Sequence, residues 1–403
     1  MLKISKLIIG GKVITRSLTK RIILFFQIFI WPKKIFRKPT YHDVVLYDFT
    51  CPSTLKKILS KYDLCILHLR GEEINWNVLI RSILKKQFWI GDAILCYATT
   101  FIKLVNPKIV LTYIDNSSRF YEIKSTFPNI KTICIQNGSR SILGDVFDGL
   151  TRTKVYKVDY FFVHNTYIGE KFNEFIDTEV IPHGSLILNS LELNRTVMPG
   201  RVVFISQVKT PLKQNSIMFS RPNNLPIYYE EFYQAELFNL KFLNEWCKMN
   251  NKNLIIVGGS MEYEDAEKDF FSQILGDSEL CFIPRKGEFS SYDLIQSAEI
   301  IVFIDSTLGY ESYGLGKKTA AFSNRISING VKNPFGWPAD FDENGIFWTN
   351  EQNELELNRI MNYLNSVSYE EWLETLKTFL PKIMEFDPGN SKFTKLLDEL
   401  LEK

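Results

Sequence analysis

The stretch Ile300-Ile-Val-Phe-Ile-Asp-Ser-Thr-Leu-Gly-Tyr-Glu-Ser-Tyr-Gly314 passes from an unbroken apolar run, through small hydroxylated residues, into a helical pattern. A short apolar run without polar alternation is typical of a strand that is covered on both faces, as in parallel sheets. We therefore expect a strand over 300–304, a turn, and a helix over 308–314. This strand-turn-helix unit is the building block of α/β domains.

The same alternation of strands and helices recurs on both sides of a polar stretch at 189–200. Expected strands of the first series lie at 44–48, 64–68, 108–114, 132–136 and 160–164, and those of the second at 201–206, 253–258, 280–284, 300–304 and 318–322. The alternation predicts an α/β fold of two Rossmann-like, doubly wound domains, over 41–190 and 200–350, followed by helices over 351–403. Ligands of such sheets bind at the carboxyl ends of the strands, in the cleft between the halves.

Composition agrees with a folded protein of a reducing compartment. With 403 residues, of which 45% are hydrophobic, the chain is long enough to bury two cores, which excludes extended disorder. Its six cysteines are far apart and mostly within apolar runs, as expected of reduced core residues in the cytoplasm. Neither the cysteines nor the four histidines have the spacing of a metal site, so we expect no metal and no cofactor.

The first 40 residues form a basic arm. They hold ten lysine and arginine residues and no acidic residue, whereas the rest of the chain has 38 basic against 46 acidic residues. The apolar run from Arg21 to Trp31 is too short to span a bilayer, and no small-residue cleavage site follows it. We expect an interfacial helix that attaches the protein peripherally to the anionic inner face of the cytoplasmic membrane. The alternative is a helix that packs on the protein's own body; the acidic body disfavours nucleic-acid binding.

The turn after the strand at 300–304 carries the first candidate binding residues. Ser306 and Thr307 are placed to cap the following helix, whose free N–H groups and dipole favour a phosphate. Glu311, one turn further on, is placed to accept hydrogen bonds from ribose hydroxyls. The alternative is an ordinary helix cap followed by a solvated glutamate.

Three other strand ends of the second series could contribute to the same site. Gly258 and Gly259 would let the backbone approach a ligand closely, although a tight turn explains them equally well. Ser206, Lys209 and Arg285 supply hydroxyl and cationic groups that could neutralise a phosphate, although cations at loop starts are commonly solvated. All five lie where carboxyl ends of strands meet one edge of a sheet, which favours a shared site for a donor nucleotide and its phosphate.

In the first series, Asp115 follows a buried strand and is the first candidate for a general base. A carboxylate near an apolar strand end can have its pKa raised toward the working range. The alternative is that Asp115 caps the helix that begins near Ser118. Residues that could bind an acceptor or a sugar at the same edge are Asn116, Gln136, Asn137 and Arg140. Asn137 and the glycine after it are also typical of a plain turn.

Two further features lie near the expected domain boundary. His183 could act as acid or base or contact a phosphate, but a lone histidine beside a glycine turn is more often structural. The aromatic loop Pro334-Phe-Gly-Trp-Pro338 could stack on a base or sugar, or it could pack between the domains.

A resemblance to a known family rests on six segments. They are Thr112-Tyr-Ile-Asp-Asn-Ser117, Ile135-Gln-Asn-Gly-Ser-Arg140, His183-Gly-Ser-Leu186, Phe303-Ile-Asp-Ser-Thr-Leu-Gly-Tyr-Glu311, Gly316-Lys-Lys318 and Phe335-Gly-Trp-Pro338. Together they resemble the bacterial surface-carbohydrate (O-antigen) biosynthesis proteins, over residues 41–370. The second half also resembles GT-B glycosyltransferases, including transferases of keto-deoxy sugars that use CMP-activated donors.

The resemblance implies a division of labour between the domains. In GT-B enzymes the C-terminal domain holds the donor nucleotide, here through Ser306, Thr307 and Glu311, and the N-terminal domain presents the acceptor. Such enzymes need no bound metal. We therefore expect a glycosyltransferase that moves a sugar from a nucleotide-activated donor to a lipid-linked or saccharide acceptor, with Asp115 and His183 as candidate catalytic residues. The alternatives are a nucleotide-sugar epimerase, a CDP-polyol phosphotransferase and a non-catalytic scaffold of the assembly complex.

Overall fold

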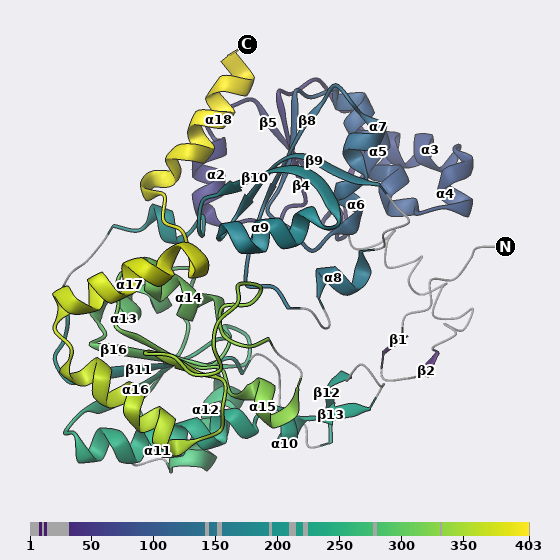
Figure 1. Ribbon diagram of the computed structural model, residues 1–403. Helices are drawn as coiled ribbons and strands as arrows, with labels where there is room; N and C mark the ends of the chain where they lie inside the picture. The colour runs from purple at the N-terminus through teal and green to yellow at the C-terminus, as the bar shows by residue number, and fades with distance from the viewer. Residues whose placement is uncertain are drawn as a thin grey trace.

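The computed structural model describes residues 32–141, 145–150, 155–192, 196–208, 215–220, 225–276, 280–330 and 333–402, together with 8–9 and 12–13. Most of the expected basic arm, and also Lys209, lie outside the described residues. Two α/β domains, each built around one parallel sheet, lie one above the other in Figure 1.

The strands of the first sheet run parallel in the order β10-β9-β8-β7-β4-β5. They are β4 (Val44–Tyr47), β5 (Leu64–Leu67), β7 (Ile109–Thr112), β8 (Lys131–Ile135), β9 (Tyr156–Val163) and β10 (Ile176–Pro182). The helices of this domain are α2 (Ser53–Leu59), α3 (Trp76–Ile83), α4 (Lys86–Ile90), α5 (Ala93–Val105), α6 (Ser118–Tyr121), α7 (Ile123–Thr126), α8 (Val146–Gly149) and α9 (Thr166–Asn173).

Alternate residues of these strands pack on opposite faces of the first sheet. Val45 and Val110 belong to a core cluster that includes the buried residues of α5 and α9. Val44 and Leu111 belong to a second cluster, which includes the buried residues of α2. Burial on both faces explains why the strands are continuous apolar runs. β10 escapes the sequence prediction because it is an edge strand that carries polar residues, and most of its side chains are only partly buried.

The second sheet is also parallel, in the order β15-β14-β11-β16-β17-β18. Its strands are β11 (Arg201–Ile205), β14 (Asn253–Val257), β15 (Phe282–Ile283), β16 (Ile300–Phe303), β17 (Thr319–Phe322) and β18 (Trp348–Thr349). The helices are α10 (Tyr229–Phe232), α11 (Gln234–Met249), α12 (Glu264–Leu275), α13 (Ser290–Ser297), α14 (Thr307–Gly314) and α15 (Arg325–Asn329). Numbered by sequence within the sheet, the order is 3-2-1-4-5-6, that of Rossmann folds. Its switch point lies between the adjacent strands β11 and β16, and ligands of such sheets bind beside that point.

The C-terminal helices divide between the domains. Buried residues of α16 (Glu354–Ser366) and α17 (Tyr369–Ile383) belong to the core cluster of the second sheet. The chain then returns, and α18 (Ser391–Glu402) buries Phe393 and Leu397 in the core of the first domain. Figure 1 shows this return, with α18 in yellow beside the upper domain. The chain therefore crosses between the domains twice, near 183–200 and near 384–390.

Three smaller, two-stranded sheets accompany the two large ones in the described structure. In one of them, β1 (Ile8–Ile9) pairs antiparallel with β2 (Lys12–Val13). β3 (Lys33–Ile35) pairs parallel with β6 (Glu73–Asn75), which leads directly into α3. In the second domain, β12 (Ile217–Ser220) pairs antiparallel with β13 (Pro226–Tyr228). No helix in the described part of the chain is long and apolar enough to cross a membrane. The predicted α/β fold with two Rossmann-like domains is confirmed by both sheet topologies.

Candidate functional site

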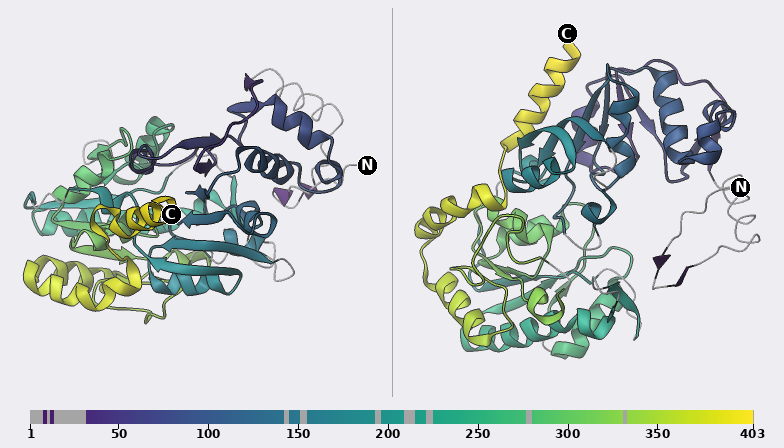
Figure 2. Two further views of the ribbon diagram at one scale, coloured as in Figure 1. Left: turned by 90° about the horizontal axis from the view of Figure 1, so that it is seen from above. Right: turned by 45° about the vertical axis from the view of Figure 1, so that its right-hand side comes forward.

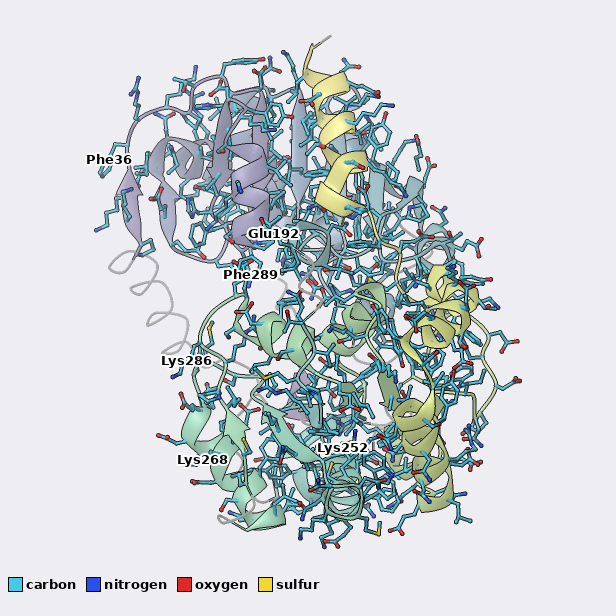
Figure 3. The ribbon with its side chains drawn as sticks, turned by 90° about the vertical axis from the view of Figure 1, so that its left-hand side faces the viewer. Phe36, Glu192, Lys252, Lys268, Lys286 and Phe289 are labelled. Carbon is cyan, nitrogen blue, oxygen red and sulfur yellow. The ribbon has the colours of Figure 1, made fainter. Side chains whose placement is uncertain are left out.

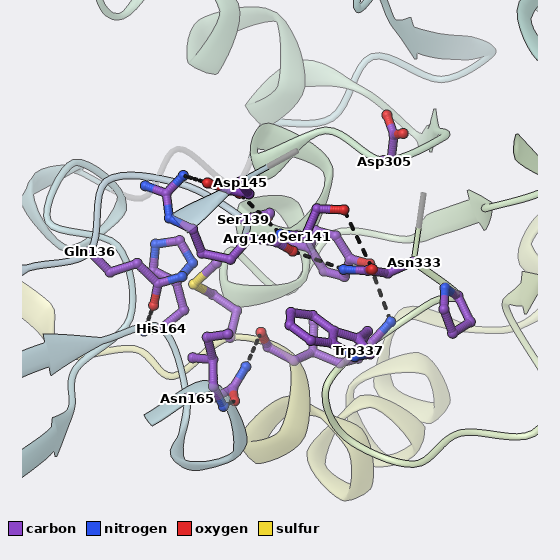
Figure 4. A pocket seen from close by; sticks show the side chains of 16 residues that line it. Gln136, Ser139, Arg140, Ser141, Asp145, His164, Asn165, Asp305, Asn333 and Trp337 are labelled. Atoms are coloured by element: carbon purple, nitrogen blue, oxygen red, sulfur yellow. Dashed lines mark hydrogen bonds and ion pairs between the residues drawn. The ribbon is translucent and has the colours of Figure 1, made fainter. Parts of the chain in front are cut away.

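A polar cavity lies between the two domains, at the carboxyl ends of strands from both sheets (Figure 4). The first domain lines it with Gln136, Ser139, Arg140, Asp145, His164 and Asn165, and the second with Asp305, Tyr310, Asn333 and Trp337. Its volume is about 90 Å³. Pockets for organic ligands commonly measure about 300–1,000 Å³, so in this arrangement the cavity is smaller than a typical ligand pocket.

The guanidinium of Arg140 is held at the cavity by a buried carboxylate. Arg140 Nε donates to Asp115 Oδ2 at 2.7 Å, and its Nη2 donates to Oδ1 of the same residue. The backbone N–H of Asn137 also donates to Asp115 Oδ1, at 3.3 Å. Burial raises the pKa of Asp115, and the Arg140 guanidinium opposes that rise. Asp115 is fully buried and does not line the cavity, so its visible role is to orient Arg140.

The loop that carries Arg140 touches the first turn of α14 in the other domain. The backbone N–H of Ser139 donates to Thr307 Oγ1 at 2.9 Å. Ser306 occupies the N-cap position of α14, where its side chain makes no capping hydrogen bond. A β-carbon added at Gly138 would lie 3.3 Å from Thr307 Oγ1, so the two segments are in close contact. Asp115 and Ser306 therefore lie on two sides of one interdomain junction.

The other predicted residues of the first domain differ in their surroundings. The side-chain amide of Gln136 bridges two strand ends, because it donates to the Gly138 carbonyl at 2.9 Å and accepts from the His164 N–H at 2.8 Å. Asn137 Oδ1 accepts a hydrogen bond from Arg140. Asn116 is exposed and does not line the cavity.

Glu311 is buried on the face of α14 that meets the first crossover between the domains. One carboxylate oxygen accepts from the hydroxyl of Ser185, and the other accepts from Tyr292 at 2.7 Å. Burial raises the pKa of Glu311 to about 7, although the hydrogen bonds from Ser185 and Tyr292 lower it in part. Both oxygens thus have protein partners in this closed arrangement, and Glu311 does not line the cavity.

His183 lies outside the cavity, where the two crossovers meet. Its Nε2 is 3.2 Å from Asn189 Nδ2 and 3.9 Å from Asp387 Oδ2. Asn189 also bonds to Asn390, so residues of both crossovers share one buried network. Burial lowers the pKa of His183 to about 4, against the opposing charge of Asp387. These contacts give His183 a structural position between the domains.

A different histidine, His164, lines the cavity. It follows β9, and burial lowers its pKa to about 3, with smaller contributions from Arg140 and His183. The sequence contained a signal for it, because His164 ends the predicted strand 160–164. The imidazole is therefore neutral at physiological pH, with a ring nitrogen available as a hydrogen-bond or proton acceptor.

Asp305 is a second cavity residue that sequence analysis did not select. Arg325, which is buried, donates from Nε to Asp305 Oδ2 at 3.1 Å and from Nη2 to Glu236 Oε1 at 2.6 Å. Among the described residues, the other oxygen of Asp305 has no hydrogen-bond partner. The pair of Arg325 and Glu236 therefore fixes a carboxylate at the end of β16, with one oxygen available to a ligand.

The strand ends at Ser206, Gly258 and Gly259 are brought together by Glu267 of α12. Glu267 is fully buried and accepts from the Ser206 hydroxyl, and also from the Gly259 N–H at 2.8 Å. A β-carbon at Gly258 would lie 3.2 Å from the backbone nitrogen of Arg285, so glycine permits close packing here. These predicted residues form one cluster beside the switch point, but they do not line the cavity.

The aromatic loop links the domains and also lines the cavity. Trp337 packs edge-on against Phe147 of the first domain, with 5.7 Å between ring centroids. Asn333 Nδ2 donates to the Arg140 carbonyl at 3.0 Å. The position of this loop is compatible with both expectations, packing between the domains and stacking on the base or sugar of a ligand. Within the described residues, no three histidine, cysteine or acidic side chains are grouped as metal ligands.

Comparison with known proteins adds a family. A family profile described as "putative O-antigen biosynthesis protein" matches residues 133–401, which is more than half of the chain. No curated protein matches the chain.

Solved structures share the fold at low sequence identity. A "putative UDP-N-acetylglucosamine 2-epimerase" from Listeria monocytogenes matches with a TM-score of 0.53 and 13% identity, over 90% of this chain and 97% of that one. A UDP-GlcNAc 2-epimerase from Methanocaldococcus jannaschii, in complex with UDP-GlcNAc and UDP, matches with a TM-score of 0.50 and 12% identity, over 90% of this chain and 100% of that one. A glycosyltransferase from Rickettsia africae ESF-5 matches with a TM-score of 0.49 and 11% identity, over 91% of this chain and 100% of that one. The first two matches agree with the GT-B arrangement of two Rossmann-like domains.

Proposed function

The chain belongs to the O-antigen biosynthesis protein family, and from that premise we propose that it is a GT-B glycosyltransferase. It moves a sugar from a nucleotide-activated donor, with CMP-linked sugars among the candidates, to a lipid-linked or saccharide acceptor at the cytoplasmic face of the membrane. The observation that carries the proposal is the interdomain cavity. Arg140 of the first domain and Asp305, just before α14 of the second, both line it. Thr307 at the start of α14 accepts a hydrogen bond from Ser139, the neighbour of Arg140.

The donor phosphate binds between Arg140 and the start of α14. The guanidinium is buried and oriented by Asp115, so it meets an anion without first losing conformational freedom. The N–H groups and dipole at the start of α14, near Ser306 and Thr307, add to the attraction. Charge that develops on the leaving phosphate is stabilised by the same groups, which is the main electrostatic contribution to such a transfer.

The nucleotide extends along the switch point of the second sheet. Ser206 follows β11 and Asp305 follows β16, and these strands are neighbours. The cluster of Ser206, Gly258, Gly259 and Arg285 lies at the carboxyl ends of β11, β14 and β15, which is where doubly wound sheets bind nucleotides. We assign this cluster to the donor and the edge with Gln136 to the acceptor. Opening of the domains gives access, and closure then orients the reacting groups.

His164 accepts the proton of the attacking hydroxyl. It lies on the wall of the acceptor domain, it is neutral, and Arg140 is among the causes that lower its pKa. A phosphate bound beside Arg140 offsets that charge, so donor binding raises the basicity of the imidazole. Asp115, the base expected from the sequence, has its carboxylate engaged by Arg140 and acts by orienting it.

The test is a thermal-shift screen of the full chain against CMP, UDP, GDP and dTDP, followed by assays of nucleotide release with lipid-linked and free saccharide acceptors. A nucleotide present at about 100 times its Kd should stabilise the protein by about 2.7 kcal/mol. Arg140→Gln should abolish that shift. Stabilisation by none of the nucleotides would contradict the proposal and favour a scaffold.

A nucleotide-sugar epimerase is the second candidate, because two of the matched structures are described as epimerases on this fold. The two activities differ in their need for an acceptor. NMR of each nucleotide sugar with the protein alone would reveal an epimer within the assay, whereas a transferase releases nucleotide only when acceptor is added.

A further inference from the structure

An apolar face that no described element covers lies at the outer end of the first domain. It consists of Ile80, Leu84, Trp89, Ile90 and Ile94, from α3, α4 and the start of α5, and we call these residues the α3–α4 face. Their exposed fractions run from 40% at Ile94 to 81% at Leu84. Figures 1 and 2 show these helices at the end of the domain opposite α18. Large apolar side chains grouped on one surface mark an interaction site.

Ile80 and Leu84 are exposed because of their positions around α3. Val78 and Ser82 are buried, and Ile80 and Leu84 lie on the other side of the same helix. The corner between α3 and α4 is fixed, because the indole N–H of Trp89 donates to the Ile83 carbonyl at 2.7 Å. Lys85 at this corner donates to Thr100 of α5 at 2.7 Å. The α3–α4 face is therefore a formed surface and not a frayed end.

The charges around the α3–α4 face are mostly positive. Residues 74–91 contain Arg81, Lys85 and Lys86 and no acidic residue. Residues 33–42 contain four lysines and arginines and no acidic residue, and β3 brings them beside β6, which leads into α3. Phe36, which is 70% exposed, stacks on Trp76 and projects from this edge in Figure 3. The nearest acids, Glu73 and Asp92, are paired with Lys33 and Arg119.

Aliphatic and tryptophan side chains that share a segment with several cations match the chemistry of an anionic lipid surface. The aliphatic groups enter the acyl boundary, tryptophan prefers the headgroup level, and lysine and arginine contact lipid phosphates. Negative charge on the partner follows from the unbroken positive charge of residues 74–91. We propose that the α3–α4 face docks the first domain on the anionic leaflet of a bilayer. The face itself is built from residues 80–94 and would hold the first domain against the membrane.

The test uses a reporter at one position of the α3–α4 face. Leu84→Cys in the full chain with Cys281→Ser is labelled with an environment-sensitive fluorophore, and Leu355→Cys in the same background is the control. Leu355 of α16 is 79% exposed, which matches Leu84, but it belongs to the second domain. Vesicles of phosphatidylcholine with about 30% phosphatidylglycerol, which carry a negative surface potential, should blue-shift the emission of the label at position 84. The emission of the label at position 355 should stay unchanged. Pure phosphatidylcholine should give a small shift or none. No shift at 84, or equal shifts at both positions, would overturn the proposal.

A second measurement tests the energetic role of the same side chains. The triple variant Ile80→Ser, Leu84→Ser, Ile90→Ser changes only exposed positions, so its melting temperature should stay within about 2 °C of the parent. Its binding to the anionic vesicles in flotation should fall at least tenfold, whereas Met249→Ser with Leu355→Ser should bind like the parent. Unchanged binding by the triple variant would overturn the proposal.

A third measurement distinguishes membrane docking from self-association through the same face. Sedimentation without lipid should show one oligomeric state for the parent and the triple variant. A dimer that only the triple variant loses would assign the α3–α4 face to self-association and overturn membrane docking. None of these readouts requires a nucleotide sugar, so the docking proposal and the proposed reaction can fail independently.

Discussion

The backbone N–H of Ser139 donates a hydrogen bond to the hydroxyl of Thr307 across 2.9 Å, and this contact joins a strand end of the first domain to the helix start of the second. The contact sits beside Arg140 at the cavity, where the donor phosphate is proposed to bind. It is therefore a bond of the closed arrangement, which must break when the domains separate.

Thr307→Val should shift the protein toward the open arrangement, because it removes the acceptor and keeps the side-chain volume. The net contribution of one hydrogen bond to stability is about 0.5–1.5 kcal/mol, which corresponds to roughly a two- to tenfold change in the ratio of closed to open molecules. Small-angle scattering should report a larger radius of gyration for Thr307→Val than for the parent. Thr307→Ser keeps the hydroxyl and serves as the control; an equal increase in both variants would contradict this role.

Asp115 and Arg140 should behave as a coupled pair in stability measurements. Asp115→Asn leaves the buried guanidinium with only the more distant carboxylate of Asp145, at 3.6 Å, and breaking a buried pair typically costs about 3–5 kcal/mol. The double variant Asp115→Asn, Arg140→Gln removes both charges, so its loss in urea unfolding should be clearly smaller than the sum of the two single losses. Additive losses would show that the two side chains do not interact in solution.

Gly259→Ala should destabilise the cluster around Glu267. The added β-carbon would lie 2.9 Å from the backbone oxygen of Ser206, which cannot move without disturbing β11. Overpacking of this kind typically costs about 1–3 kcal/mol. Gly149→Ala is the matched control, because nothing lies within 4 Å of its β-carbon. Thermal unfolding should show a lower Tm for Gly259→Ala only; equal Tm values for both variants would contradict the close approach.

Sequence patterns predicted the sheets better than the site, and the reason is physical. Strands such as β16 and β8 are buried on both faces, so their apolar runs can be recognised locally. β18 was missed because its two residues lie in an aromatic segment without strand periodicity. Strand-end residues such as Arg140 and Asp115 could be predicted together, because parallel strands end at one edge.

The residues that hold the site in place could not be found in this way. Glu267 reaches Ser206 from 61 positions away, and Arg325 reaches Glu236 from 89 positions away. Glu267, Glu236 and Arg325 belong to helices, and only the packing of those helices against the sheet brings these side chains to the strand ends. A local pattern cannot separate Glu267 from the solvated acids beside it on α12, Glu264 and Asp265.

Glu311→Gln should remove a pH dependence from stability. The pKa of Glu311 is raised to about 7 in the folded protein, against 4.5 in the unfolded chain. Between these values the folded state binds more protons, so the stability contributed by Glu311 is present below pH 4.5 and is lost as the pH rises through 7. The difference amounts to about 3 kcal/mol.

The measurement is urea unfolding of the parent and Glu311→Gln at pH 5 and pH 8. The variant should gain relative to the parent between these two values, because the other titrating groups are common to both proteins and cancel. Glu374→Gln, at an exposed glutamate, is the control and should show no such gain. A constant difference between parent and Glu311→Gln would place the pKa of Glu311 near its ordinary value.

His164→Gln should separate catalysis from donor binding. Glutamine can still form hydrogen bonds at the cavity wall but cannot take a proton, and loss of a general base typically lowers kcat by about 10²–10⁴. Donor affinity should stay within a few-fold, because Arg140 and the start of α14 are unchanged. His183→Gln is the matched control, since that ring does not line the cavity. It should lower the free energy of unfolding and leave kcat nearly unchanged.

The pH profiles give an independent check on His164. Its pKa is lowered to about 3 in the free protein, so kcat/KM should show no acid limb from this group between pH 5 and 8. A donor phosphate beside Arg140 should raise the pKa of His164, so the acid limb of kcat should lie at a higher pH than that of kcat/KM. His164→Gln should lose this acid limb from kcat. If the ring titrates near pH 6.5 by NMR in the free protein, burial does not control it, and the proposed coupling between donor binding and the base is wrong.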